Sequence, residues 1–394
     1  MVGIIHRNRG SVFFASILVL IVALSAAAGT AAAQSAPDCS TVSYDGDGSE
    51  ANPYEVGNVD QLQCIEEHDL GANYVQVSDI DASETMSWNN GKGFNPIDIP
   101  PGSSGTTFSG FTGTFDGQDH KITNLTIDRG KSGIAGLFGA VGSGGKVTNV
   151  SVVDVNITGL GSGVGGLVGA NNGTVARSHA TGLVNGTSLV GGLVGSNDGG
   201  TVTKSYATAE VDGSELVGGL VGGNGFGSSL LGNGRGGEVT ESYATGSVNG
   251  SRIVGGLLGG NNGTVTESYA AGAVNGSVRY AVGGLVVLNE GTVEESYWDV
   301  NETGQTVSAG NGTGLNTSEM TGSAARGNMT ALEFTNTWKT VSGGYPVLAW
   351  QTDGGVGSND SEDAEGEGLP GFTVVTALLA LLTVVAAASR QRTK

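Results

Sequence analysis

Hydrophobic and polar positions recur in one phrase that is repeated between residues 134 and 300 of this chain. The phrase begins with Val-Gly-Gly-Leu-Val-Gly and continues through an Asn/Gly turn, Thr-Val and a Ser-aromatic-Ala sequence. Its good copies start at Val164, Val190, Val217, Val254 and Val282, after a looser forerunner at Ile134. Successive starts are 30, 26, 27, 37 and 28 residues apart. A period of this length predicts stacked repeats that bury their apolar faces on one another.

Aligned copies form columns of identical residues. An Asn stands seven residues after each starting Val, at Asn171, Asn197, Asn224, Asn261 and Asn289. A Ser column is followed directly by an aromatic column, at His179, Tyr206, Tyr243, Tyr269 and Tyr297. These columns predict an all-β fold, a right-handed parallel β-helix (β-solenoid) of about six or more coils with N- and C-terminal capping segments.

The columns also predict local roles. Asn at a repeated corner can form a ladder in which each amide bonds the next coil and the backbone tolerates a left-handed conformation. Gly pairs suit positions with positive φ or close approach to a neighbouring chain. His179 stands where the other coils have Tyr, so we expect it to fill a structural column and not to be catalytic.

Patterns outside the repeats predict the flanking elements. Gln61–His68 is helical and suits a short cap helix, whereas Tyr74–Asp81 and Lys121–Ile127 alternate like strands. The predicted organisation is a signal peptide at 1–33, an N-terminal cap with entry strands at 34–111, the β-solenoid at 112–300, a C-terminal cap at 301–351, an acidic linker at 352–369 and a sorting signal or transmembrane segment at 370–394.

Both ends of the chain carry apolar runs. Arg7 and Arg9 precede a run from Val12 to Ala28 and a small-residue cleavage site, which predicts a secretory signal, with an uncleaved anchor as the alternative. A second run covers residues 373–388 and is followed by basic residues, which favour the cytoplasmic side. The mature chain is therefore expected on the outer face of the cell envelope.

Composition narrows the classes of function. The chain has 72 Gly and only 7 Pro without a Gly-X-Y period, which excludes collagen. It has 17 basic and 37 acidic residues, so we expect no nucleic acid partner. A strongly acidic surface is typical of proteins that stay hydrated in high salt, and the alternative is an acidic surface protein from an ordinary habitat.

Few residues suggest cofactor or metal chemistry. Cys39 and Cys64 are the only cysteines, and an oxidising exterior makes a disulfide between them a reasonable expectation. The Gly-x-Gly-x-x-Gly matches that begin at Gly161 and Gly232 are followed by no predicted helix, so no dinucleotide site is expected. Asp45 and Asp47 suit an Asp/Gly turn better than a calcium loop. We expect no cofactor.

Two segments are candidates for a functional site. Asp116, Asp119 and His120 could form an acid/base cluster, but they more simply cap and turn a strand. The longest repeat contains an inserted loop at 225–235, and insertions in repeat arrays often line a binding face. A contact made by this loop would use Phe226, Leu230, Leu231 and Arg235.

Asn-x-Ser/Thr sequons are frequent. Exposed turns of a secreted protein are suitable sites for N-glycans, so we expect some sequons to be used. The candidates are Asn124, Asn149, Asn156, Asn172, Asn185, Asn249, Asn262, Asn275, Asn301, Asn311, Asn316, Asn328 and Asn359.

The repeats resemble the GLUG-motif proteins, through the Gly-Gly-Leu-Val-Gly phrase and the Ser-Tyr-Ala-Thr-Gly phrase seen in residues 190–208. The flanks, including Asn52-Pro-Tyr-Glu-Val, resemble secreted haloarchaeal members. The resemblance implies an extracellular, adhesion-like or envelope-associated protein. Some members are IgA-cleaving metallopeptidases, but no His of this chain begins the His-Glu-x-x-His zinc motif that these enzymes require.

The C-terminal segment resembles the archaeal PGF sorting signal, carried here by Pro370, Gly371 and Phe372. This resemblance implies cleavage by an archaeosortase and lipid attachment of the mature protein. Thr373 departs from the usual Gly after Phe. A simple C-terminal membrane anchor is the alternative.

These observations lead to three hypotheses about function. The first is a non-enzymatic, glycosylated surface β-solenoid that acts in adhesion or envelope structure, with the S-layer, a neighbouring cell surface or glycans as partners. The second is a β-helix polysaccharide-active enzyme, but the acidic residues do not gather on one coil, and Glu241, Glu267 and Glu295 share a column that suggests a solvated ridge. The third is a carbohydrate-binding module that uses exposed Tyr or Trp for stacking.

Overall fold

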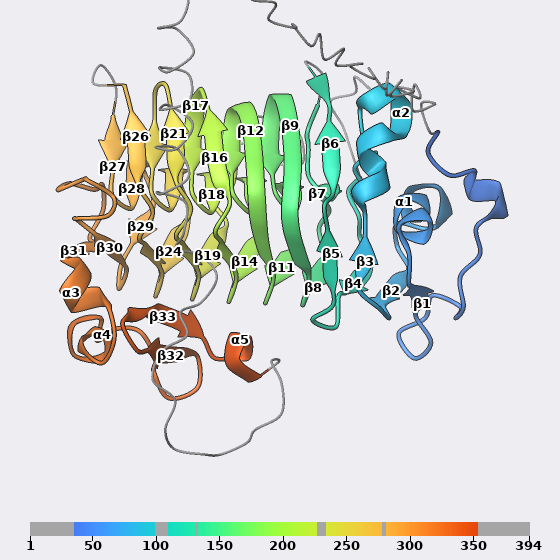
Figure 1. Cartoon of the computed structure of the whole chain (residues 1–394). Coiled ribbons are helices and arrows are strands. Elements are labelled where there is room, and N and C mark those ends of the chain that lie inside the picture. The colour runs from blue at the N-terminus through green and yellow to red at the C-terminus, as the bar shows by residue number, and fades with distance from the viewer. Residues whose placement is uncertain (1–34, 99–108, 131–132, 227–233, 278–280, 354–394) are drawn as a thin grey trace, which may run out of the picture. The chain divides into compact units, whose positions relative to one another are not determined.

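The repeats form a β-solenoid of about six turns, in agreement with the predicted all-β stack. The computed structural model describes residues 35–98, 109–130, 133–226, 234–277 and 281–353. Every strand pair in the solenoid is parallel, and each coil contributes strands to three sheets whose members lie side by side in Figure 1. The predicted signal peptide, acidic linker and sorting signal lie outside the described residues.

The three sheets follow the order of the coils. Sheet 1 contains β1 (Tyr54–Val56), β2 (Asn73–Gln76), β4 (Thr114–Asp116), β8 (Lys146–Thr148), β11 (Thr174–Ala176), β14 (Thr201–Thr203), β19 (Glu238–Thr240), β24 (Thr264–Thr266) and β29 (Thr292–Val293). Sheet 2 contains β7 (Phe138–Val141), β10 (Val168–Asn171), β13 (Val194–Asn197), β18 (Val221–Asn224), β23 (Leu258–Asn261) and β28 (Val286–Asn289).

Sheet 3 is the largest, because each coil adds up to three short strands to it. Its members are β3 (Ile80–Asp81), β5 (Lys121–Thr123), β6 (Thr126–Asp128), β9 (Ser151–Gly165), β12 (His179–Gly191), β15 (Tyr206–Ala207), β16 (Glu210–Gly213), β17 (Glu215–Gly218), β20 (Tyr243–Ala244), β21 (Val248–Gly250), β22 (Val254–Gly255), β25 (Tyr269–Ala270), β26 (Val274–Gly276), β27 (Val282–Gly283), β30 (Tyr297–Asp299) and β31 (Thr313–Leu315).

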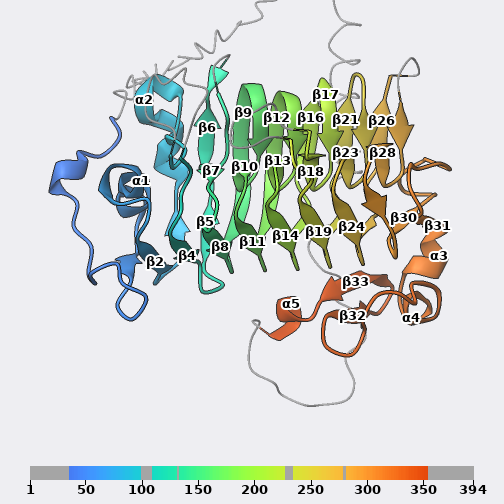
Figure 2. The same ribbon diagram turned by 180° about the vertical axis from the view of Figure 1, so that it is seen from behind.

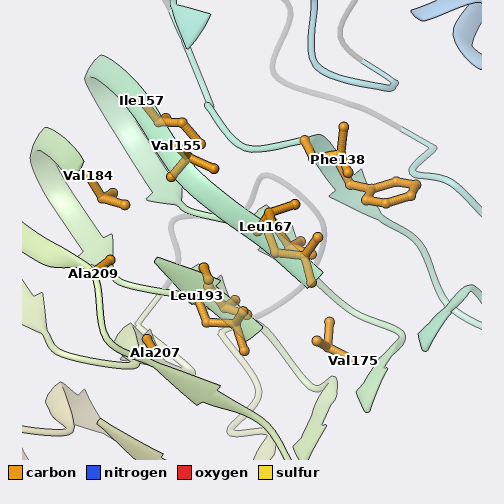
Figure 3. Close-up of a cluster of buried hydrophobic side chains, with 14 of the residues drawn as sticks. Phe138, Val155, Ile157, Leu167, Val175, Val184, Leu193, Ala207 and Ala209 are labelled. Carbon is orange, nitrogen blue, oxygen red and sulfur yellow. The ribbon is translucent and has the colours of Figure 1, made fainter. Parts of the chain in front are cut away.

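Apolar columns fill the interior of the solenoid. The Leu of each Gly-Gly-Leu phrase is fully buried, as are the Val residues at the centres of the sheet 1 strands. Figure 3 shows Leu167 and Leu193 pointing inward between neighbouring strands, with Val175 and Val184 around them. Full burial of such a side chain stabilises the fold by about 1.5–3 kcal/mol, and a one-residue register shift would move the whole set outward.

Glycine pairs at the start of each repeat permit close approach of successive coils. A Cβ at Gly191 would lie 2.7 Å from the amide nitrogen of Gly222 in the next coil, as well as 2.0 Å from the carbonyl oxygen of Val194 in its own coil. One at Gly192 would lie 2.2 Å from the carbonyl oxygen of Gly219 in the next coil. Neither glycine has positive φ, so close packing is the reason for this pair.

The N-terminal end is covered by α1 (Val59–His68). Asn58 caps this helix by accepting a hydrogen bond from the Gln61 amide at 2.9 Å, and Leu62 and Ile65 on its inner face are fully buried. A disulfide joins Cys64 of α1 to Cys39 in the short helix η1 (Cys39–Thr41). Two further short helices, η2 (Ser83–Ser87) and α2 (Trp88–Gly91), lie beside the entry strands (Figure 1).

The C-terminal end is closed by Trp298 and the segment that follows it. Trp298 stands in register with Ala270 of the coil before, and its indole nitrogen donates to the Gln305 carbonyl oxygen at 2.9 Å. The chain then crosses the end of the core, where the Gly284 amide donates to the Val307 carbonyl oxygen.

Residues 316–353, called the strap below, then run back along the solenoid. The strap contains α3 (Thr317–Met320), α4 (Ala324–Asn328), the antiparallel hairpin β32 (Trp338–Val341) and β33 (Gly344–Leu348), and α5 (Trp350–Asp353). In Figures 1 and 2 the hairpin and α5 lie beside the middle coils, while α3 and α4 lie near the last coil. No helix of the described residues has the length and apolarity needed to cross a membrane.

Candidate functional site

The Asn column forms a continuous hydrogen-bonded ladder along one corner of the solenoid. Asn171 Nδ2 donates to Asn197 Oδ1 at 2.8 Å, and Asn197 donates to Asn224 in the same way at 2.9 Å. Asn224 and Asn261 continue the ladder at 2.8 Å each, ending at Asn289. The first four amides are fully buried, so their polar atoms are satisfied by one another and by nearby backbone.

The backbone at the Asn ladder differs from the prediction in one respect. The ladder residues do not have positive φ; the left-handed conformation occurs instead at the residue just before each Ser of the next column. Arg177, Lys204, Glu241, Glu267 and Glu295 occupy that position, with φ between 47° and 50°. The expectation of left-handed Asn was therefore wrong, because the sharp bend falls one corner later.

The Ser column compensates for that bend. The later Ser hydroxyls (Ser205, Ser242, Ser268 and Ser296) each accept the amide N–H of the Ser in the coil before, at 3.1–3.2 Å. The first, Ser178, accepts the amide N–H of Val150 at 3.1 Å. Each of these hydroxyls also donates to the carbonyl oxygen two residues earlier, as Ser205 does to Thr203 at 2.8 Å. Ser is required here because a small hydroxyl can donate and accept at once inside the wall.

The aromatic column (His179, Tyr206, Tyr243, Tyr269 and Tyr297) is a stack of nearly parallel rings over at least its first four members. Ring centroids lie 4.5 Å apart between His179 and Tyr206 and 4.9 Å apart at the next two steps, with interplanar angles of 4° or less. His179 thus occupies a Tyr position, as predicted. Its ring is largely buried, which lowers its pKa to about 4, and the charge of Lys121 adds to this effect.

The strap covers the aromatic column. Trp338 lies against Tyr243 and Tyr269, with ring centroids 6.0 and 5.6 Å away. The Tyr269 hydroxyl donates to the Pro346 carbonyl oxygen at 2.6 Å, and the Trp350 indole nitrogen donates to that of Lys204 at 3.0 Å. Burial raises the pKa of the Tyr243 and Tyr269 hydroxyls well above the usual value.

This covering corrects the idea of an exposed aromatic platform. A stacking surface for sugars needs accessible ring faces or edges, but Tyr243 and Tyr269 are buried beneath the strap. The predicted acidic ridge is also partly covered: Glu241 lies 3.5 Å from the Lys204 ammonium and accepts a hydrogen bond from Thr337 of the strap at 2.9 Å. Burial, and then the neighbouring Glu241 and Glu295, raise the pKa of Glu267.

The sequence predicts a C-terminal cap over residues 301–351 but does not predict that the strap, residues 316–353, covers the aromatic column. The apolar residues of the strap, Trp338, Leu348 and Trp350, do not recur with the period of the repeats. The signal available in the sequence is that large apolar residues in a polar segment indicate packing against another part of the chain. Together with the Tyr residues they form a hydrophobic cluster distinct from the main core.

The Asp116, Asp119 and His120 group has structural partners. Asp116 Oδ1 accepts from Asn149 Nδ2 at 2.8 Å and from the Gln118 amide at 3.0 Å. His120 Nδ1 lies 3.2 Å from Asp79 Oδ1, and Asp119 has positive φ in a tight turn. These contacts fit the capping and turning roles. Across the described residues, no group of three or more His, Cys, Asp or Glu side chains is placed to hold a metal ion.

The inserted loop is described only at its two ends, and Leu230 and Leu231 lie outside the described residues. Phe226 lies over the outer face of sheet 2, where a Cβ at Gly260 would be 2.9 Å from its ring. Arg235 lies near Gly199 of the preceding coil. The described ends therefore pack on the outside of the coils and bring no titratable cluster together.

The sequons differ in how open they are. Both polar atoms of the Asn149 side chain are hydrogen-bonded: Nδ2 donates to Asp116 Oδ1, and Oδ1 accepts from Arg177 Nε, each at 2.8 Å. Thr303 of the Asn301 sequon is buried, with its hydroxyl donating to the Asp299 carbonyl oxygen at 2.5 Å. Asn156, Asn185 and Asn275 are exposed on the outer side of sheet 3. Asn359 and the Pro370-Gly371-Phe372 motif lie outside the described residues.

The fold and its side-chain ladders define a β-solenoid whose repeated columns stabilise the stacking of successive coils. The GLUG motif matches residues 186–212, one full repeat of this solenoid. The chain is 39% identical to halomucin of Haloquadratum walsbyi over 164 residues, which is 39% of this chain and 2% of halomucin. It is 29% identical over 193 residues to an Evansella cellulosilytica protein described as a candidate Gly-rich membrane protein.

The chain spans only a small part of these relatives, 2% of halomucin and 21% of the Evansella protein. Among solved structures, it resembles a Bacteroides ovatus protein described as a candidate immunoglobulin A1 protease, with a TM-score of 0.60 and 20% identity. That match covers 77% of this chain and 94% of the other. At this level of identity the likeness supports the solenoid fold alone.

Proposed function

We propose that this chain is a non-enzymatic, secreted surface protein whose β-solenoid acts as a scaffold in adhesion or envelope structure. The observation that carries the proposal is the use of the repeated polar columns. The Asn and Ser columns are buried and hydrogen-bonded between coils, and the aromatic column is sealed by the strap. Similarity to halomucin and to a described membrane protein supports a place at the cell surface.

We further propose that the protein is glycosylated and anchored at its C-terminus. Several sequons lie on exposed faces of the solenoid, and residues 370–372 resemble the sorting signal discussed above. An archaeosortase would cleave near Pro370 and transfer the mature chain to a lipid. Mass spectrometry of the mature C-terminus separates this processing from a retained membrane anchor, because only processing removes residues 373–394.

Gene deletion followed by adhesion, aggregation and cell-shape assays tests the scaffold role. We expect a change in at least one of these properties, restored by the full chain but not by one that ends before residue 370. Depolymerisation of an envelope polysaccharide by the purified protein, abolished by Asp116→Ala, would instead show an enzyme.

A further inference from the structure

One column of sheet 3 carries sequons in a strict register. Asn185 pairs with Asp212 of the next coil, Asp212 with Asn249, and Asn249 with Asn275. Each of the four is followed by Gly and then Ser or Thr, so three of them are sequons and the Asp is not. We call these four residues the sequon column.

The sequon column faces outward beside an open groove of about 310 Å³. The groove is lined by three of its members with their following Gly and Ser residues: Asn185, Gly186, Asp212, Gly213, Ser214, Asn249, Gly250 and Ser251. Asn185 and Asn275 are exposed and Asn249 is half-buried, so the acceptor amides lie at the surface of the folded chain.

Asn249 and Asn275 are direct neighbours, whereas Asn185 is separated from Asn249 by one coil. Asn275 Nδ2 donates to Asn249 Oδ1 at 3.0 Å, so the two amides already touch. Neighbouring strands are about 4.8 Å apart, and a hydrated sugar ring attached to an amide is wider than this. Two glycans on directly opposed Asn residues of adjacent coils would therefore overlap at their first sugar. Asn185 has no sequon Asn directly opposite it, because its partners in register are Thr158 and Asp212.

We infer that Asn249 and Asn275 form an either/or glycosylation site: a folded chain carries an N-glycan on one of them and never on both. This inference rests on the proposed glycosylation. Asn275 is the preferred acceptor, because it is the more exposed and stands on β26, the edge strand of this part of sheet 3, where no further strand residue of the described chain pairs with it. The Asp at position 212 keeps the rest of the column free of adjacent acceptors.

The test uses the full chain produced in a halophilic host that N-glycosylates such sequons. Arg252→Lys and Thr264→Ala are introduced so that cleavage after Arg yields one fragment, residues 236–279, with Asn249 and Asn275 as its only sequons. The intact mass of this fragment then counts its glycans. We expect one glycan, mostly on Asn275, and no fragment with two.

Two variants sharpen the result. Asn275→Gln should raise occupancy at Asn249 several-fold and leave Asn185 unchanged, which serves as the internal control. Asp212→Asn should create competition in the same column and lower occupancy at Asn185.

The outcomes separate the two proposals. A fragment with two glycans overturns the either/or site, as does a bare fragment from a chain glycosylated elsewhere. A chain with no glycan at any sequon overturns the proposed glycosylation itself.

Discussion

A single imidazole in the aromatic column makes the stability of this protein depend on pH. His179 is stacked on Tyr206, and its Nδ1 is buried without a hydrogen-bond partner. The folded state lowers its pKa from 6.5 to about 4, so folding favours the neutral ring. The unfolded chain therefore binds more protons than the folded chain between these values, and stability is lost as the pH falls through this window.

We predict that His179→Phe removes this dependence, because Phe keeps the stacked ring but cannot be protonated. The free energy of unfolding, measured by denaturant titration at pH 7 and pH 4, should fall more for the parent chain by on the order of 2 kcal/mol. Parallel curves for the two proteins would show that His179 is not responsible.

At the same scale, the Asn ladder allows a comparison between the middle and the end of a column. Asn224 donates to Asn261 and to the Gly237 carbonyl oxygen and accepts from Asn197, all within the buried wall. We predict that Asn224→Ala destabilises the fold by about 2–4 kcal/mol, because it removes a buried hydrogen bond from each ladder neighbour and leaves the Gly237 amide without its acceptor.

Asn289→Ala is the matched control, since Asn289 is half-buried and has a ladder neighbour on only one side. In the same denaturant titration, Asn289→Ala should lower the free energy of unfolding by about half as much as Asn224→Ala, or less. Equal losses at the two positions would mean that the ladder is not the source of the stabilisation.

At the scale of elements, the repeats were predictable and the strap was not. Column identity at a fixed period was enough to predict the coils, the Asn ladder and the place of His179, because these features need only nearest-neighbour register. The strap depends on contacts such as that between Trp350 and Lys204, 146 residues apart, which no local pattern encodes. The left-handed bend before each Ser was also missed, because Glu, Lys and Arg at these positions do not signal positive φ.

The strap should detach without unfolding the solenoid. Trp338, on strand β32 of the hairpin, is fully buried against the Tyr243 and Tyr269 rings. We predict that Trp338→Ala weakens the docking of the strap by about 3 kcal/mol. In this variant, residues 316–353 should exchange their amide hydrogens faster and be cleaved by protease before the solenoid is. Amides in β10–β24 should stay protected.

Thr340→Ala is the control for this experiment, since Thr340 lies on the same strand but is exposed. It should leave exchange unchanged. Loss of protection throughout the coils of the Trp338 variant would show that the strap and the solenoid unfold as one unit.

At the scale of the molecule, charge sets the conditions under which the scaffold is stable. The chain has a formal net charge of −20 at pH 7, and Glu290, Glu294 and Glu295 lie exposed together on the last repeat. Repulsion among such carboxylates opposes the compact state, and salt weakens it because the screening length falls from about 8 Å at 0.15 M to about 3 Å at 1 M.

We therefore predict that raising NaCl from 0.15 M to 1 M increases the free energy of unfolding by on the order of 1 kcal/mol. The Glu290→Gln, Glu294→Gln, Glu295→Gln variant should gain less from the same salt, because it has three fewer charges to screen. Urea titrations at the two salt concentrations measure both values. An equal gain in the two proteins would assign the effect to strengthened apolar burial, which acts on the buried Leu and Val columns and is independent of these carboxylates.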